Sequence, residues 1–380
     1  MEGIMEKIIL LGTIIFVSVI LFISGLLVNK FSNNGIFFGV RIPKEYEKDE
    51  DLIKLEKEYK KKFTLFILPF LIIINILMIF NTKISIYLIT LFVLIIVSNI
   101  PLIIYWKKTM KLKEEKGFRS FGENVVVVDT SIRKPKVRED NVIIKTKTFL
   151  TLLIIPLITM IVTLIAYKNV PNPFPIHYNA AGVADSFVAK DGFKGFFYLV
   201  LFPILTQTGM IVLLTLTNKF AVNGKTEINS GTLEEIKKQR KVFKRINSIL
   251  LFIIAIEISI MFSIIQFCTL FNWNVQVINY IFLPVIFITI IVFSVITYKI
   301  GQGGKNIKYN SNEKEIYRDD DKYWLFGNFY CNKNDPSIFV EKRVGIGWDV
   351  NLGNPIGATI MILPFVLIAI LIIYFIVQGL

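Results

Sequence analysis

The single histidine of the 380-residue chain, His177, lies in a short stretch, residues 171–190, that begins with three prolines and carries one acid and one base, Asp185 and Lys190. Imidazole titrates near neutral pH, so this side chain could sense pH, carry a proton, or bind a metal together with Asp185 or Asp191. One histidine and two carboxylates are a thin ligand set, and no nucleophile–histidine–acid arrangement can be assembled. The other interpretation is a histidine held by hydrogen bonds in a fixed turn. We predict that the stretch binds a ligand, with no metal, through His177, Asn179, Gly182, Asp185 and Lys190.

A carboxylate in the middle of an apolar run is the second candidate for chemistry. Glu257 stands inside the apolar residues 253–259. A charged carboxylate in hydrocarbon costs several kcal/mol, so it must be protonated, paired or open to water. A functional group and a structural hydrogen bond both remain open as interpretations. Weaker candidates of the same kind are Asn75, Asn99, Gln207 and Gln266, which could hydrogen-bond between helices.

Long apolar blocks surround these residues and determine the class of protein. Hydrophobic residues make up 54% of the chain and the mean hydropathy is +0.60. A block of about 18 or more apolar residues indicates a transmembrane helix. We predict an all-α integral membrane protein with about eight spans, the first of which is a span and not a cleaved signal peptide. The blocks are 7–28, 64–80, 84–106, 148–167, 196–217, 248–270, 277–298 and 356–378.

The distribution of basic residues predicts the orientation of these spans. Almost all of the 43 lysines and arginines fall in four loops, residues 29–63, 107–147, 218–247 and 299–355. Basic loops are retained in the cytoplasm, so both termini are expected outside, together with the His177 stretch. The net charge of +14 is explained in this way, and the basic clusters lack the interleaved aromatic residues of a nucleic-acid site, so no direct nucleic-acid binding is expected.

The cytoplasmic loops carry predicted structure of their own. Residues 44–62 have apolar side chains at helical spacing and predict an amphipathic helix that runs into the second span. Thr232 and Glu235 form a plausible capping box for a basic helix that enters the sixth span. Residues 323–351 alternate apolar and turn residues, which predicts a small hairpin-like module. Partner binding in the cytoplasm is predicted at Arg41, Tyr330, Asp335, Lys342, Arg343 and Trp348, against the alternative that these loops pack on their own bundle.

Two motifs in the chain resemble known bacterial membrane families. The spacing of Pro175, His177, Asn179, Gly182, Asp185 and Lys190 is similar to a P-x-H-[WYF]-N-x-x-G-x-x-D-x-x-x-x-K pattern in a membrane domain of unknown function. That domain occurs in the SdpI-type immunity family. The module near the C-terminus resembles a second uncharacterised family that is often fused to the first. The residues that carry this second resemblance are Gly327, Phe329, Tyr330, Asn332, Asp335, Pro336, Phe339, Val340, Lys342, Arg343, Gly345, Gly347, Trp348 and Asn351, with a first-loop motif at residues 38–43.

The resemblance implies a location and a type of function. SdpI-type proteins protect a cell from a toxic peptide and can recruit a cytoplasmic repressor to the membrane. Their second half, which is linked to immunity, is replaced here by the other module. A multi-pass protein of the bacterial cytoplasmic membrane is therefore expected.

Two functions remain as hypotheses, neither of them enzymatic and neither with a cofactor. The first is a sensor or immunity-like binding protein that responds to an envelope-active peptide or envelope state and recruits a cytoplasmic regulator. The alternative is a proton- or cation-coupled transporter that uses Glu257, with Asn75 and Gln207 nearby. The expected regions are an N-terminal three-helix region (1–147), an SdpI-like membrane domain (148–217), a basic loop with a two-helix hairpin (218–300), and the module with the last helix (301–380).

Overall fold

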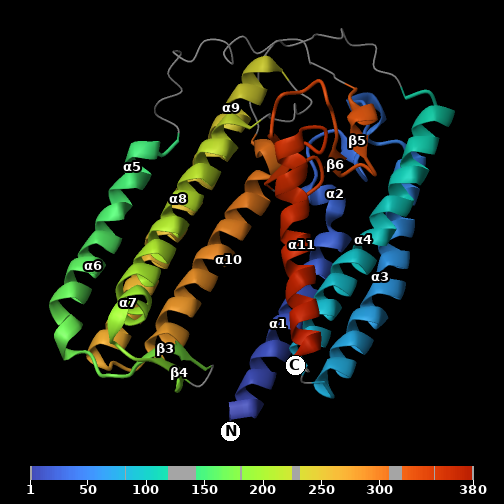
Figure 1. Ribbon diagram of the computed structural model, residues 1–380. Helices are drawn as coiled ribbons and strands as arrows, with labels where there is room; N and C mark the ends of the chain where they lie inside the picture. Colours follow the sequence, from blue (N-terminus) through green and yellow to red (C-terminus); the bar gives the residue numbers. More distant parts are fainter. Residues whose placement is uncertain are drawn as a thin grey trace. The chain divides into compact units, whose positions relative to one another are not determined.

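The computed structural model describes residues 2–81, 83–118, 143–179, 182–224, 232–307, 319–345 and 347–378, which form long helices and small two-stranded hairpins (Figure 1). The chain divides into two compact units. Unit 1 contains residues 1–6, 131–223 and 244–297, and unit 2 contains residues 7–130, 224–243 and 298–380. Each unit is built from segments that are distant in the sequence.

Within the described part of the chain, seven helices are long and apolar enough to cross a membrane. They correspond to seven of the eight predicted spans. The first predicted span is also helical, as α1 (Glu2–Leu26), but its apolar part, Leu10–Leu26, is shorter than the other seven, so an eighth crossing stays a prediction. The seven are Glu50–Ile79, Ile84–Glu115, Thr146–Asn169, Gly192–Phe220, Glu234–Phe271, Ile278–Gly304 and Pro355–Val377.

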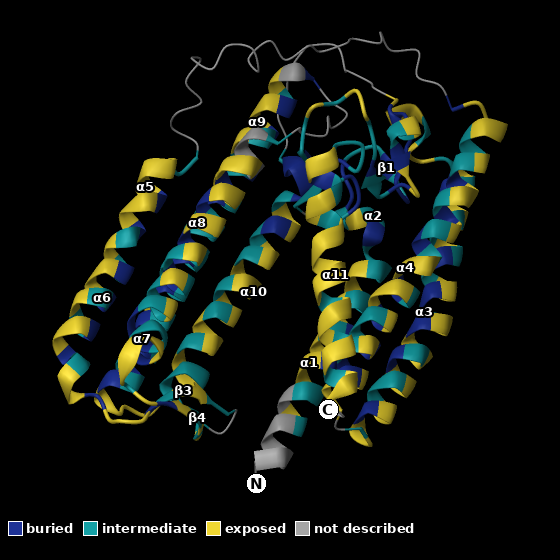
Figure 2. Ribbon diagram, viewed as in Figure 1, coloured by how far each residue is buried: buried dark blue, intermediate teal, exposed yellow. Residues whose placement is uncertain are grey.

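The surfaces of these helices are apolar, as a bilayer requires. None of the most apolar window of α11 (Pro355–Val377) is buried inside the protein, and Ile373 is 61% exposed. Figure 2 shows exposed residues along α11 and along the outer faces of α3 (Glu50–Ile79) and α4 (Ile84–Glu115). Soluble monomers rarely expose apolar patches of this extent. The protein is therefore a multi-pass membrane protein, and the side on which each terminus lies stays a prediction.

Unit 1 is a helical bundle with a hairpin at one end. Its chain runs through α5 (Thr146–Leu150), α6 (Ile154–Ala166), the strands β3 (Phe174–Tyr178) and β4 (Ala184–Val188), α7 (Gly192–Phe196) and α8 (Phe202–Asn223). The membrane part of α9 (Leu233–Phe271) and α10 (Leu283–Ile300) complete it. Two π-helical segments, η5 (Phe197–Leu201) and η6 (Ile278–Phe282), precede α8 and α10. A core beneath the hairpin contains Phe174, Val188, Leu199 and Val200.

Unit 2 joins α1, α3, α4 and α11 to a set of short elements. These are α2 (Val28–Phe31), the hairpin of β1 (Ile36–Phe37) with β2 (Val40–Arg41), the hairpin of β5 (Trp324–Leu325) with β6 (Phe329–Tyr330), and the hairpin of β7 (Phe339–Glu341) with β8 (Trp348–Val350). Its core includes a cluster of aromatic rings: Phe38 lies 4.6 Å from Tyr59 and 5.4 Å from Tyr105, between ring centroids. The Tyr59 hydroxyl donates to the Gly25 carbonyl at 2.7 Å, which ties α3 to α1.

The predicted local structure of the loops is largely confirmed. The helix expected at 44–62 begins at Glu50, after the short turn η1 (Lys44–Tyr46), and continues into the second span without a break. Asp49 caps it by accepting from the Asp51 N–H at 2.9 Å. The basic helix before the sixth span also runs on unbroken, as α9, and the Glu235 N–H donates to Thr232 Oγ1 at 3.3 Å. The hairpin-like module consists of the β5–β6 and β7–β8 hairpins.

Candidate ligand-binding cavity

The β3–β4 hairpin presents the histidine at the end of unit 1 that contains α7 and η6. The strands pair from Phe174 with Val188 to Tyr178 with Ala184, with irregular register on both sides of His177. His177 Nδ1 lies 2.6 Å from Asp185 Oδ1, and the two side chains are 67% and 43% exposed. The structure therefore joins these two predicted ligand-binding residues directly across the hairpin, where solvent reaches both of them.

The turn of the hairpin is built by the predicted asparagine and glycine. The Gly182 N–H donates to the Asn179 carbonyl at 2.8 Å, and the Val183 N–H donates to Asn179 Oδ1 at 2.9 Å. Gly182 has a φ of +74°, and a Cβ there would lie 2.7 Å from Gln276 Nε2. Glycine is favoured at this position because its backbone is left-handed, and any side chain would also displace the end of the Gln276 side chain. The turn is thus packed against the connection between α9 and α10.

Lys190 anchors the base of the hairpin. Its ammonium donates to the carbonyls of Lys168 at 3.1 Å and Val170 at 2.9 Å, beyond the end of α6. Its backbone N–H donates to Asn172 Oδ1 at 2.9 Å. A cation at the carboxyl end of a helix is favourable because the last carbonyls lack helical partners. Lys190 therefore holds the hairpin in position, while the predicted ligand contact of this residue stays a prediction.

A cavity of about 390 Å³ lies beneath the hairpin, entirely within unit 1. This volume is in the range of small-molecule sites. The walls come from the hairpin, from η5 and the start of α8, from the end of α9, and from η6. Both π-helical segments contribute to it, and such segments are frequent at functional sites. The lining residues are Phe174, Pro175, Ile176, His177, Tyr178, Asn179, Gly182, Tyr198, Leu199, Phe202, Pro203, Thr206, Phe262, Ile265, Gln266, Thr269, Val275, Ile278 and Asn279.

Most of the cavity wall is apolar or aromatic, with a few polar groups among the rings. Tyr178 Oη and Thr269 Oγ1 lie 3.4 Å apart on one wall. Gln266 is 5% exposed, and its amide nitrogen donates to the Leu199 carbonyl at 2.8 Å and to Thr163 Oγ1 at 3.3 Å. The sequence singled out Gln266 only as a weak intramembrane candidate, and gave no signal that Thr269 or Tyr198 would line a cavity.

A ladder of buried hydrogen bonds connects α6, α8 and α9 further along the bundle. Thr159 and Ser263 hydroxyls lie 2.7 Å apart. Gln207, 1% exposed, donates through Nε2 to the Ser259 carbonyl at 2.6 Å and to Ser263 Oγ at 2.8 Å. Pairs of this kind hold helices together in membranes. The side chain of Gln207 therefore joins α8 to Ser259 and Ser263 of α9.

Glu257 lies on α9 and pairs with α10. Thr289 Oγ1 donates to Glu257 Oε1 at 2.6 Å, while Glu257 Oε2 is buried and has no partner among the described residues. Glu257 does not line the cavity. Asn75 belongs to unit 2, where it donates to Ser18 Oγ at 2.9 Å and to the Leu71 carbonyl at 2.7 Å. Glu257, Asn75 and Gln207 thus share no hydrogen-bond partner with one another.

Two of the residues predicted to contact a cytoplasmic partner, Arg41 and Arg343, are buried in a charged cluster of unit 2. We call Arg41, Lys113, Asp319, Asp320, Asp321 and Arg343 the charged cluster. Arg41 and Arg343 are 2% and 0% exposed. Arg343 pairs with Asp320 and Asp321 and donates to the Gly39 carbonyl at 3.2 Å. Lys113 Nζ lies 2.7 Å from both Asp319 and Asp321, and the Arg41 N–H donates to Asp321 at 3.0 Å.

The charged cluster unites three loops in one body. Its members come from the first loop, the end of α4 and the last loop, and they carry three positive and three negative charges, of which only Asp319, 47% exposed, lies largely at the surface. The Arg343 guanidinium also lies 4.7 Å from the centre of the Trp324 ring. The two arginines therefore face the interior of unit 2, so a partner would meet their neighbours first. Their role in partner binding stays a prediction.

The remaining predicted partner-binding residues also make contacts within the module. The Tyr330 hydroxyl donates to Asp335 Oδ2 at 2.9 Å, and burial raises the pKa of this phenol. Asn351 Nδ2 donates to the Asp335 carbonyl at 3.0 Å. The Lys342 carbonyl accepts from Asn33 Nδ2 at 2.8 Å, and the Trp348 ring lies 5.5 Å from that of Phe243. These contacts explain why the module needs its particular asparagine, aspartate and aromatic residues.

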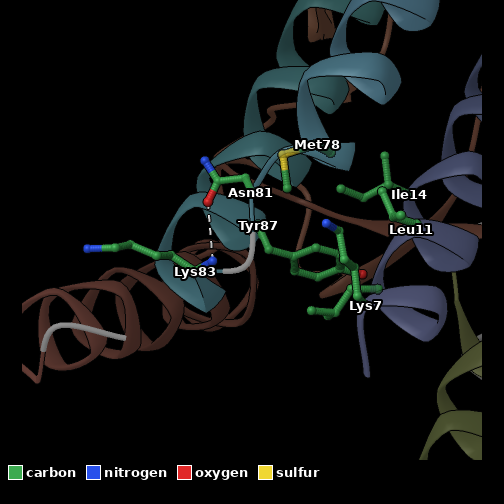
Figure 3. Close-up of a pocket in the computed structure, with 8 residues that line it drawn as sticks. Lys7, Leu11, Ile14, Met78, Asn81, Lys83 and Tyr87 are labelled. Atoms are coloured by element: carbon green, nitrogen blue, oxygen red, sulfur yellow. Dashed lines mark hydrogen bonds between the residues drawn. The ribbon is translucent and has the colours of Figure 1, made fainter. Parts of the chain in front are cut away.

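A second hollow, in unit 2, is too small for a ligand. It lies between α1 and the α3–α4 connection and is drawn in Figure 3 with Lys7, Ile14, Met78 and Tyr87. Its volume of about 10 Å³ is that of a single water molecule. Among the described residues, no group of three or more histidine, cysteine or acidic side chains could hold a metal ion. The cavity beneath the hairpin is therefore the candidate site.

The fold and the cavity define a multi-pass membrane protein with a ligand-sized site at one end of a helical bundle. Two segments match family models. Residues 154–206, from α6 through the hairpin and η5 into α8, match the domain of unknown function DUF1648. Residues 333–357, which include β7, β8 and the start of α11, match the family of unknown function DUF5808. No curated protein and no solved structure matches the chain.

Proposed function

We propose that this chain is a membrane-embedded binding protein of the sensor or immunity type, which binds an envelope-active peptide in the cavity beneath the β3–β4 hairpin. The observation that carries the proposal is the cavity of about 390 Å³, with mostly apolar walls and the exposed His177–Asp185 pair in its hairpin. Such a site suits an amphipathic molecule that arrives from the membrane surface. A buried enzyme site would instead need groups that react, and this wall offers mainly rings and amides.

The location follows from the charge distribution and from the resemblance to the SdpI-type family. The hairpin end of unit 1 lies outside the bacterial cytoplasmic membrane, because the loops at the other ends of its helices are strongly basic. In this orientation the cavity faces the compartment in which toxic peptides act. The loops of unit 2 face the cytoplasm, where they recruit a regulator when the cavity is filled.

A susceptibility and transcription assay with matched variants tests this function. Cells that lack the protein are challenged with a panel of envelope-active peptides and complemented with wild type, Thr269→Trp, Ile291→Trp or His177→Ala. Thr269 lines the cavity, whereas Ile291 is 60% exposed on α10 and absent from the wall. Wild type and Ile291→Trp are expected to restore resistance, and Thr269→Trp to fail. Equal rescue by both tryptophan variants would exclude the cavity as the binding site.

His177→Ala separates the hairpin from the interior of the cavity. Because His177 and Asp185 are exposed, the substitution leaves the apolar wall in place and removes one polar contact at the entrance. Partial loss of rescue is expected. Purification of the protein from membranes, with and without the active peptide, tests the cytoplasmic side: a regulator should be recovered with the peptide present, and failure to recover any cytoplasmic protein counts against recruitment.

The alternative function is transport, favoured by one observation. Glu257 Oε2 is buried and has no partner in the part of the chain that the structure describes, which is the situation of a group that binds a proton or cation in transit. In a transporter, Glu257→Gln abolishes coupled flux while the hydrogen bond from Thr289 is retained. Flux of the same size in wild type and Glu257→Gln liposomes excludes this function.

A further inference from the structure

Gln266 has a fixed orientation at the wall of the cavity. The Leu199 carbonyl can only accept a hydrogen bond, so the atom of Gln266 that lies 2.8 Å from it must be the amide nitrogen. The same nitrogen donates to Thr163 Oγ1, whose own hydrogen goes to the Thr159 carbonyl at 2.7 Å. Both amide hydrogens of Gln266 are therefore used, and its carbonyl oxygen points elsewhere.

The carbonyl oxygen of Gln266 is an acceptor that needs a donor. Gln266 lines the cavity and is only 5% exposed. No described residue donates a hydrogen bond to its Oε1. Because the side chain lines the cavity, this oxygen can accept a hydrogen bond from whatever group occupies the cavity. In the empty protein water can do so. A ligand that displaces this water must bring its own N–H or O–H.

The remainder of the wall restricts the ligand further. Phe174, Phe202, Phe262 and Ile265 present apolar surface, and none of the described lining residues is lysine or arginine. An anionic headgroup would be buried here without a countercharge, which is unfavourable. The wall therefore favours an apolar ligand with neutral hydrogen-bond donors. A peptide meets this requirement, because backbone N–H groups recur between apolar side chains.

We propose that Gln266 is a specificity-determining residue that accepts a hydrogen bond from a backbone N–H of an apolar peptide segment seated in the cavity. This inference rests on the proposed function. The acceptor is held by α6 and by η5, two elements packed in the core of unit 1, so it is positioned before the ligand arrives.

Binding of a peptide and its N-methylated form to the full-length protein in lipid nanodiscs tests the inference. The probe is an acetylated, amidated tetraleucine peptide with a fluorescent label, and the second form carries methyl groups on its backbone nitrogens. Loss of one buried hydrogen bond weakens binding about tenfold. Wild type should show this loss on methylation. Gln266→Met should bind both forms within about twofold of each other, and the control Asn99→Met, on a helix of unit 2, should discriminate as wild type does.

The outcomes separate this inference from the proposed function. Equal binding of both forms by wild type overturns the role of Gln266 and leaves the cavity as a peptide site. A penalty that persists in Gln266→Met comes from the bulk of the methyl groups and overturns the role as well. The comparison in wild type stands even if Gln266→Met does not fold. Absence of binding by either form overturns the proposed function itself.

Discussion

Removal of Arg343 is expected to open the module of unit 2. In Arg343→Met, Asp320 and Asp321 lose the guanidinium that pairs with both of them. Asp321 keeps Lys113 at 2.7 Å, whereas Asp320 keeps Arg41, whose Nε lies 3.6 Å away. Their side chains are 8% and 4% exposed, so water replaces little of the lost interaction. Breaking a buried ion pair by removing one partner costs about 3–5 kcal/mol.

Native-state proteolysis measures this cost. Chymotrypsin cuts after Trp324 and Tyr330, which are 2% and 1% exposed and become accessible when the module opens. When opening is fast, the cleavage rate follows the open population, so 3–5 kcal/mol corresponds to an increase of about two to four orders of magnitude. The matched control is Lys111→Met, which removes an exposed pair with Glu115 and should change the rate less than about fivefold.

A double variant tests the physical reason. Arg343→Met combined with Asp320→Leu removes both charges of the pair, so the combined destabilisation should be smaller than the sum of the single effects. If Arg343→Met is cleaved within about fivefold of wild type, the charged cluster does not stabilise the module and this reasoning is wrong. If the double variant shows simple additivity, the two side chains act independently.

Two further predictions concern the same unit. Burial lowers the pKa of the Lys305 amine from 10.5 to about 8, so the unfolded state binds more protons than the folded state between these pH values. The free energy of unfolding therefore rises as the pH increases from about 8 to 10.5, and the rate of chymotryptic cleavage falls. Lys305→Met should remove this pH dependence of the cleavage rate. A rate that rises with pH over this range in wild type, after correction for the protease, would contradict it. Gly39 has a φ of +80°, and a Cβ there would lie 2.5 Å from the Gly327 carbonyl oxygen. Gly39→Ala should therefore destabilise the module by about 1–3 kcal/mol, measured by the same proteolysis assay. The control Gly12→Ala places its Cβ in open space and should leave the cleavage rate unchanged.

Local signals in the sequence predicted the elements well. Apolar blocks longer than the bilayer core predict helices because every backbone group in lipid must be paired within the segment. The turn at Asn179 and Gly182 has the same local origin, since these residues tolerate the backbone that the turn needs. The charged segment before the second span was recognised by its helical spacing. The first block also forms a helix, α1, whose described apolar part is Leu10–Leu26.

Long-range packing was beyond what the sequence could predict. Arg41 and Asp321 are separated by 280 positions, and no local pattern indicates that they pair in the interior of unit 2. Arg41 and Arg343 were predicted to bind a partner, which requires exposed side chains, and charged side chains are usually exposed. The cavity depends on side chains from four segments and on two π-helical turns, whose departure from regular helix has no composition signal. Gln266 was noticed as a polar residue, but the direction of its carbonyl is a property of the assembled bundle.

The central claim, that an envelope-active peptide binds in the cavity of unit 1, is tested most directly by photo-cross-linking in cells. A benzophenone amino acid replaces Phe262, in the cavity wall, or Ile291, 60% exposed on α10, and the peptide identified by the susceptibility assay is added before illumination. Peptide adducts are expected from position 262, and none above background from position 291. Adducts of equal yield from both positions, or from position 291 alone, would show that the peptide meets the lipid-facing surface and not the cavity.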